Sequence, residues 1–268
     1  PCPGREPGGP AHLMNTLLTT LTAVFAGIGR AQFFLINVLA ALPAALTRPR
    51  ILAQQVHSVG VMSLIIVVLS GSFVGMVLAL QGFRTLVRFG AEESLGVFVA
   101  LVIVRELGPV VTALLVAGRA GSALAAEIGL MKATDQLSAM EMMATDPLKR
   151  VIAPRFLAML ISMPLLSAIF SVMAIGIAGG HAVGVSLLGV DDGSYWSQIR
   201  ASVEVQDIVD SLIKSTLFGF AVAWIAVYQG YHAAPTSEGV SRATTSTVVL
   251  SSLAILALDF VLTAFMFR

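Results

Sequence analysis

Long apolar runs separated by short polar segments set the pattern of this chain. The clearest run, Gly60–Gly82, carries no charged residue over 23 positions. About 20 apolar residues suffice for a helix to cross the hydrocarbon core of a bilayer. Four later runs are also long and contain at most two charged residues each: Ser94–Gly118, Leu157–Val190, Ser211–Tyr231 and Ser246–Phe267. The pattern therefore predicts five transmembrane helices.

The segment before the first run is apolar but less regular. Asn15–Leu46 is broken by Arg30, Gln32 and Asn37 and is followed by a basic turn. It is long enough to cross a bilayer, but its scattered polar residues favour a helix that lies along the membrane interface. We therefore expect an interfacial helix over 15–50, with a sixth span as the alternative. Residues 1–14 are rich in proline and glycine and predict a disordered tail, which leaves 51–268 as the membrane domain.

Composition supports the same fold class. Of the 268 residues, 57% are hydrophobic and 12% are charged, whereas soluble domains carry about 25% charged residues. We therefore predict an all-α integral membrane protein. The net charge of +1 gives no indication of nucleic-acid binding. The single cysteine and the isolated histidines show no metal-ligand spacing, so no metal site is expected.

Basic residues are unevenly distributed among the segments between the predicted spans. If the N-terminus is cytoplasmic, that side holds eight lysines and arginines and the opposite side holds four. Cytoplasmic loops carry an excess of lysine and arginine in membrane proteins. We therefore expect a cytoplasmic N-terminus and a C-terminus on the opposite side.

Charged residues inside the predicted spans are the strongest candidates for function. Glu106 lies at the middle of its span, where an unpaired charge costs at least about 2.5–3.5 kcal/mol. Arg105 is its neighbour, and adjacent helical residues point about 100° apart, so at least one of the two needs a partner on another helix. Asp259 is a candidate partner for Arg105, and Lys214 for Glu106 or for an anionic ligand. The cluster either fixes helix packing or lines a cavity for a substrate headgroup.

A second candidate is the polar segment between the second and third spans. Leu137, Met140 and Ala144 recur with the spacing of a helix face, and Asp146-Pro147 is typical of the start of a new helix. A short amphipathic helix with several methionines suits docking into a groove of another protein, because methionine adapts to irregular surfaces. A helix that rests on the membrane surface is the alternative.

Glycines recur at four-residue spacing at Gly71 and Gly75 and again at Gly176, Gly180 and Gly184. Such spacing lets helices approach closely, either within one chain or between two copies. The chain has no G-x-x-x-x-G-K-[ST] phosphate loop and no G-x-S-x-G elbow. We therefore expect neither ATP binding in this chain nor an enzyme.

Several motifs of this chain closely resemble a known family. They are the stretch VRELGPVVTALLVAGRAGSALAAEIGLMKATDQLSAMEMMATDPLKRVIAPRF at Val104–Phe156, LIKS at Leu212–Ser215, PTSEGVSRATT at Pro235–Thr245 and SSLAILALDFVLTAFMF at Ser251–Phe267. They are similar to the MlaE, or YrbE-type, permeases of the bacterial system for the maintenance of lipid asymmetry. The resemblance covers nearly everything from about Gly60 onward.

The resemblance implies an ABC transporter of the bacterial inner membrane in which this chain is the permease subunit. The fold would be an interfacial helix followed by five spans, related to ABCG-like exporters. Two permease copies would pair with an ABC ATPase (MlaF-like), a STAS protein (MlaB-like) and a hexameric MCE protein (MlaD-like). ATP and Mg would be bound by the ATPase, with no cofactor in this chain. The complex would move phospholipid between the inner membrane and a periplasmic carrier, and the C-terminus would be periplasmic.

The resemblance also suggests roles for individual residues. The lipid contacts would be Arg105, Glu106 and Lys214, with Asp259 and Arg242 in the same intramembrane charge network. The apolar wall of the cavity would include Phe73, Val77 and Leu78. A coupling helix around 127–145 would dock on the ATPase through Glu127, Gly129, Met131, Lys132, Gln136 and Met140.

Two other functions remain as alternatives. One is an ion-coupled secondary transporter with Glu106 and Asp259 as protonatable carriers, although the sequence shows no inverted repeat. The other is a structural scaffold for a periplasmic lipid-binding ring, in which the buried charges serve assembly alone.

Overall fold

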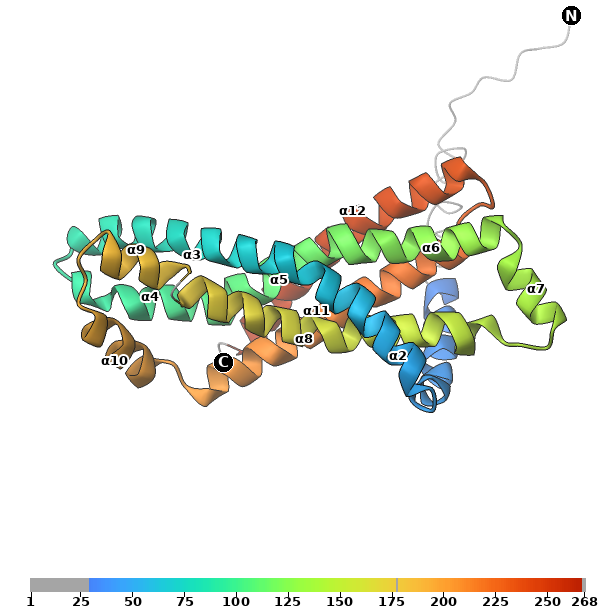
Figure 1. Ribbon diagram of the computed structural model, residues 1–268, viewed down its shortest axis with the longest axis horizontal. Helices are drawn as coiled ribbons and strands as arrows, with labels where there is room; N and C mark the ends of the chain where they lie inside the picture. The colour runs from blue at the N-terminus through green and yellow to red at the C-terminus, as the bar shows by residue number, and fades with distance from the viewer. Residues whose placement is uncertain (1–28, 177, 267–268) are drawn as a thin grey trace, which may run out of the picture.

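The computed structural model describes residues 29–176 and 178–266 (Figure 1). Within these ranges all regular secondary structure is helical, which confirms the predicted all-α membrane fold. The predicted tail at 1–14 and the first part of the predicted interfacial helix lie outside the described residues.

Six helical runs in the described part of the chain are long and apolar enough to cross a bilayer: Gly29–Leu46, Pro49–Val87, Glu92–Ala133, Leu148–Ser186, Val205–His232 and Ser237–Met266. The last five follow the long axis of the molecule, whereas the first lies across it (Figure 1). The first run packs against the end of the fifth, where Trp224 Nε1 donates to the Ala31 carbonyl at 3.3 Å. This crosswise position suits the predicted interfacial helix, which stays a prediction.

The second, third and fourth runs are divided into helices by short turns of different winding or by a break, whereas the first, fifth and sixth are each one continuous helix. The α-helices are α2 (Pro49–Val56), α3 (Met62–Val87), α4 (Leu95–Val102), α5 (Gly108–Val116), α6 (Ser122–Ala133), α7 (Gln136–Met142), α8 (Ala153–Ile175), α9 (Gly180–Ser186), α10 (Asp192–Ser202), α11 (Val205–His232) and α12 (Ser237–Met266). One 3₁₀ turn, η2 (Glu92–Ser94), precedes α4. The π-helical turns are η1 (His57–Val61), η3 (Ile103–Leu107), η4 (Ala117–Gly121) and η5 (Leu148–Ile152). Such π-turns are rare and often lie at functional sites.

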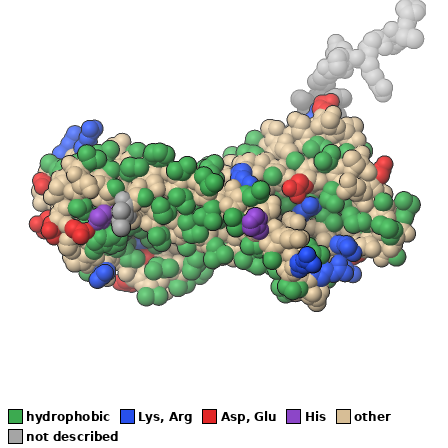
Figure 2. Space-filling model, in the orientation of Figure 1, with side chains coloured by type: hydrophobic (Ala, Val, Ile, Leu, Met, Phe, Trp, Pro, Cys, Tyr) green, Lys and Arg blue, Asp and Glu red, His purple; other side chains and the backbone are tan. Residues whose placement is uncertain are grey.

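The surface follows the apolar pattern of the sequence. Apolar side chains cover much of the left half and the waist of the molecule, and charged side chains gather at its left end (Figure 2). The helices α9 and α10 lie at that end, and α7 lies at the opposite end of the bundle (Figure 1). The molecule therefore presents an apolar middle between two more polar ends, as a bilayer requires.

The third predicted span is shorter than its apolar run. We expected one helix over Leu157–Val190, but α8 ends at Ile175 and α9 begins only at Gly180. A side chain at Gly180 would lie 2.8 Å from Val99 Cγ1, so glycine allows α9 to pack closely on α4. Apolarity shows that a segment avoids water, but it does not show where a helix breaks.

The close glycine spacing on α3 serves packing within one chain. A Cβ atom at Gly71 would lie 2.9 Å from the Phe170 carbonyl oxygen, and one at Gly75 would overlap the Ala174 carbonyl oxygen. Both glycines therefore face the backbone of α8, as small residues do between membrane helices. The sequence left open whether such glycines pack within one chain or between two copies. Gly71 and Gly75 pack within the chain.

The predicted coupling helix around 127–145 is two helices. The chain turns after α6 through Asp135, which has a φ of +56°, and α7 ends before Ala144, which has a φ of +54°. The periodic stripe therefore holds for Leu137 and Met140 and not for Ala144. The predicted start at Asp146 is confirmed, because its carboxylate accepts a hydrogen bond from the Leu148 N–H at 2.9 Å.

Candidate functional site

The site is built around η3, the π-turn in the middle of the second long run. Pro109 follows this turn and has no N–H to bond the Arg105 carbonyl four residues earlier. The Lys214 ammonium group on α11 donates to that carbonyl instead, at 3.0 Å. A proline in the span therefore removes the usual helical donor to this carbonyl at depth, and a lysine of another helix supplies one.

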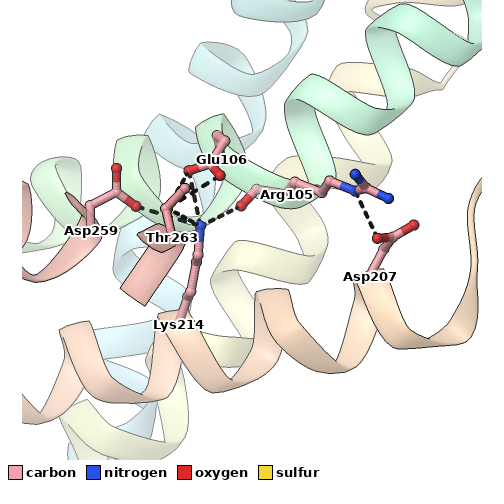
Figure 3. Close-up of polar contacts among 6 residues, drawn as sticks. All are labelled: Arg105, Glu106, Asp207, Lys214, Asp259 and Thr263. Carbon is pink, nitrogen blue, oxygen red and sulfur yellow. Dashed lines mark hydrogen bonds and ion pairs between the residues drawn. The ribbon is translucent and has the colours of Figure 1, made fainter. Parts of the chain in front are cut away.

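Lys214 is the centre of an intramembrane cluster (Figure 3). Its side chain is 3% exposed. Besides the backbone carbonyl, its Nζ atom donates to Glu106 Oε2 at 2.9 Å and to Thr263 Oγ1 at 2.7 Å. Asp259 Oδ1 lies 3.8 Å away. An ammonium group has three hydrogens, so Lys214 uses all of them to join η3, α11 and α12. The predicted contact between Lys214 and Glu106 is confirmed.

Arg105 points away from this centre toward the start of α11 (Figure 3). Its Nε donates to Asp207 Oδ1 at 2.7 Å, and the other oxygen of Asp207 accepts from the Glu204 N–H at 3.1 Å. The predicted pairing of Arg105 with Asp259 is therefore wrong, because Asp259 lies beside Lys214. The Arg105 side chain remains 42% exposed.

Two members of the site were not identified from the sequence. Asp207 lies before the predicted fourth span, Ser211–Tyr231, yet α11 begins at Val205 and includes it. Glu204 and Asp207 form a reciprocal cap at the first turn of that helix, and their three-residue spacing is the signal that would have placed them. Thr263 gave no signal, because a lone threonine is ordinary in an apolar span.

A polar cavity of about 220 Å³ opens beside the cluster. It is lined by Arg105, Glu106, Glu204, Gln206, Asp207, Asp210, Lys214, Thr263 and Met266. Its lining holds two basic and four acidic side chains. The two terminal nitrogens of Arg105 have no partner within the described residues, so they are the donors available to a ligand. The cavity therefore offers one free cationic fork beside an excess of carboxylates.

Comparison with known proteins identifies the family. The family description Permease MlaE matches residues 52–265. The chain belongs to the MlaE permease family. It is 59% identical to the intermembrane phospholipid transport system permease protein MlaE of Haemophilus influenzae, over 91% of this chain and 93% of that protein.

More distant relatives of this MlaE-family chain come from other lineages. A probable ABC transporter permease protein of Rickettsia bellii is 39% identical, over 96% of this chain and 98% of that protein. The chloroplastic protein TRIGALACTOSYLDIACYLGLYCEROL 1 of Arabidopsis thaliana is 34% identical, over 80% of this chain and 61% of that protein.

Arg242 does not join the charge cluster expected from the family resemblance. It lies in the second turn of α12, and its side chain is 78% exposed and paired with Glu238 at 2.9 Å. Asp259 is 17 residues farther along the same helix, or about 25 Å at the rise of an α-helix. The spacing along α12 therefore places Arg242 near one end of the bundle, outside the network.

The residues expected to couple this MlaE-family permease to an ATPase lie on α6 and α7. Several are held by contacts within the chain: Glu127 pairs with Arg155 at 3.1 Å, and Lys132 donates to the Tyr231 carbonyl at 2.8 Å. Met131 contacts Arg155 and Gly129 packs beside Val240. Gln136 is exposed and Met140 is half-buried. The most exposed apolar side chains of this region are instead Leu130, Met142 and Met143.

The expected apolar wall lies on α3. Phe73 and Val77 are 62% and 56% exposed, and Leu78 is half-buried against the core. The outer face of α3 is therefore free in the single chain to contact lipid or a second copy. Their role as a cavity wall stays a prediction.

Proposed function

We propose that this chain is the permease subunit of an ATP-driven transporter that moves phospholipid between a bacterial inner membrane and a periplasmic carrier. The printed name of the Haemophilus influenzae relative supports the phospholipid substrate, because the two chains match over nearly their full lengths. The observation that carries the proposal is the charged cluster between η3, α11 and α12, which opens onto a cavity and leaves the Arg105 fork free.

In this proposal Arg105 contacts the lipid phosphate. A planar guanidinium binds phosphate through two parallel hydrogen bonds, and the two terminal nitrogens of Arg105 have no hydrogen-bond partner among the described residues. Lys214 and Glu106 have a different immediate role, since Lys214 already uses its three hydrogens. They hold three helices together, and they reach the substrate when those helices move apart during the cycle.

The charge balance of the cavity favours a zwitterionic headgroup. An anionic lipid would add a negative charge beside four carboxylates, and like charges brought together disfavour binding. A headgroup that carries an amine next to its phosphate matches both parts of the lining, with the phosphate at Arg105 and the ammonium group near Asp210. We therefore expect phosphatidylethanolamine to bind better than phosphatidylglycerol.

The partners follow from the family and from the chain itself. Two copies of the permease would assemble with an ABC ATPase, a STAS protein and a hexameric MCE protein, with the N-terminus cytoplasmic and the C-terminus periplasmic. Exposed Met142, the last residue of α7, and its neighbour Met143 suit a groove on the ATPase, because methionine side chains adapt to their partner. ATP and Mg would bind to the ATPase.

Copurification followed by a transport assay tests this function. The full chain is purified from its native membrane with its partners and reconstituted into liposomes that contain fluorescent phosphatidylethanolamine. We expect an ATPase to copurify and lipid transfer to require ATP. Transfer that follows a proton gradient without an ATPase would overturn the proposal in favour of an ion-coupled transporter. Intact assembly without any lipid transfer would favour a scaffold.

A further inference from the structure

A second cavity lies beside the charged one and differs from it in character. It has a volume of about 370 Å³ and lies between α8, α10 and α11. Its lining is almost entirely apolar: Val104, Ala168, Ser171, Val172, Ile175, Gly176, Trp196, Ile199, Val203, Ile208, Ser211 and Leu212. Small-molecule sites are typically clefts of about 300–1,000 Å³ with apolar walls. We call this cavity the apolar slot.

The wall of the slot on α10 is held in place by contacts outside it. Tyr195 is fully buried and its hydroxyl donates to the Ile175 carbonyl at 3.0 Å. His181 Nε2 lies 2.7 Å from Asp192 Oδ1, and the His181 ring lies 5.4 Å from that of Trp196. These contacts fix α10 against α8 and α9 and orient Trp196 along the slot. The slot is therefore formed before any ligand enters.

The slot and the polar cavity are neighbours through shared helices. Val104 lines the slot and the next residue, Arg105, lines the polar cavity. On α11, Asp207 faces the polar cavity, and Ile208, about 100° farther round the helix, faces the slot. The two cavities therefore border the same stretch of η3 and of the first turn of α11, where Arg105 pairs with Asp207.

We propose that one phospholipid occupies both cavities, with its headgroup at Arg105 and one acyl chain in the apolar slot between α8, α10 and α11. This inference rests on the proposed function, because it takes the polar cavity as the headgroup site. An acyl chain fits better than a helix of a partner protein. A helix with its side chains is about 10–12 Å wide, much wider than a single acyl chain, and the slot is lined by only twelve residues.

Photolabelling of the full chain in nanodiscs tests the inference. The probe is phosphatidylethanolamine with a diazirine on one acyl chain, and mass spectrometry of the peptides locates the label. Ala168→Trp fills the slot from an exposed position on α8, and Ile208→Trp fills it from α11. Leu165→Trp is the matched control, since Leu165 is exposed on α8 but does not line the slot. Arg105→Gln removes the headgroup contact.

We expect label on the slot residues in the wild type and in Leu165→Trp. Either filling variant should remove it, and Arg105→Gln should lower it about tenfold, the loss that follows from one charge-assisted contact. Label on the exposed face of α12, at Leu253 and Leu256, reports ordinary bilayer lipid and should stay constant.

Slot labelling that Arg105→Gln leaves unchanged would overturn the inference, because the slot would then hold bilayer lipid unconnected to the headgroup site. A slot that takes no label in the wild type would overturn it as well and would favour a protein segment as the occupant. Neither result touches the proposed function, which fails if reconstituted transfer of phosphatidylethanolamine is independent of ATP or does not occur.

Discussion

Replacing Lys214 by methionine removes the centre of the cluster while keeping most of the side-chain volume. The substitution eliminates three hydrogen bonds and leaves Glu106 and Asp259 without the cation that lies between them. The Lys214 side chain is 3% exposed, so solvent screens these interactions weakly. Breaking a buried ion pair by removing one partner typically costs about 3–5 kcal/mol. We expect Lys214→Met to lose that much free energy of unfolding.

The measurement is unfolding of the purified chain in mixed micelles with an increasing fraction of sodium dodecyl sulfate. Lys149→Met is the matched control, because Lys149 is 58% exposed and pairs with Asp146 at 3.4 Å. Exposed pairs of this kind contribute about 0–1 kcal/mol, so the control should unfold nearly as the wild type does.

A second substitution tests the physical reason for the loss. Glu106→Gln in the Lys214→Met background removes one orphaned carboxylate, and the double variant should recover about 1–2 kcal/mol, since residues in one network couple by this amount. If the Lys214→Met protein is as stable as the Lys149→Met control, the cluster does not hold the three helices together.

Three further predictions follow from the packing, from α10 and from the cavity. Gly75→Ala should destabilise the protein by about 1–3 kcal/mol, because the new methyl group overlaps the Ala174 carbonyl. Gly118→Ala is the control, because a methyl group there has open space around it. Unfolding in mixed micelles measures both variants, and equal stabilities would contradict the close packing of α3 on α8. Burial raises the pKa of Tyr195 to about 12, so the fold favours the neutral phenol. Its contribution to stability should be complete below about pH 10 and be lost as the pH rises toward about 12; thermal unfolding between these pH values should show a smaller loss in Tyr195→Phe, and identical profiles would contradict the assignment. Asp210→Asn should reduce the preference for phosphatidylethanolamine over phosphatidylglycerol in competitive lipid binding, and an unchanged ratio would count against the ammonium contact.

The sequence predicted the spans well because each is specified locally. A run such as Gly60–Gly82 must avoid water whatever its neighbours are, and length then decides that it can cross a bilayer. The break before Gly180 was missed for the same reason, since Leu157–Val190 carries no Lys, Arg, Asp or Glu and the break depends on packing against α3 and α4.

The sequence predicted which residues belong to the candidate site better than it predicted which of them pair with each other. A charge at depth is expensive, which identified Arg105, Glu106, Lys214 and Asp259. Which charges meet depends on helix rotation and on the exact start of α11, and neither is specified by composition. Asp207 can pair with Arg105 because α11 begins at Val205 and includes it. The charged residues around Val205 are typical of a loop, so the sequence did not indicate a helix there.

In the proposed function, the free guanidinium of Arg105 receives the lipid phosphate at the polar cavity. The most direct test of this contact is the rate of ATP-dependent phosphatidylethanolamine transfer by the reconstituted complex with Arg105→Gln, beside Arg88→Gln as an exposed arginine outside the cavity. We predict intact assembly in both variants, a loss of transfer of about tenfold or more in Arg105→Gln, and none in Arg88→Gln. Equal transfer rates in the two variants would show that Arg105 does not bind the lipid phosphate.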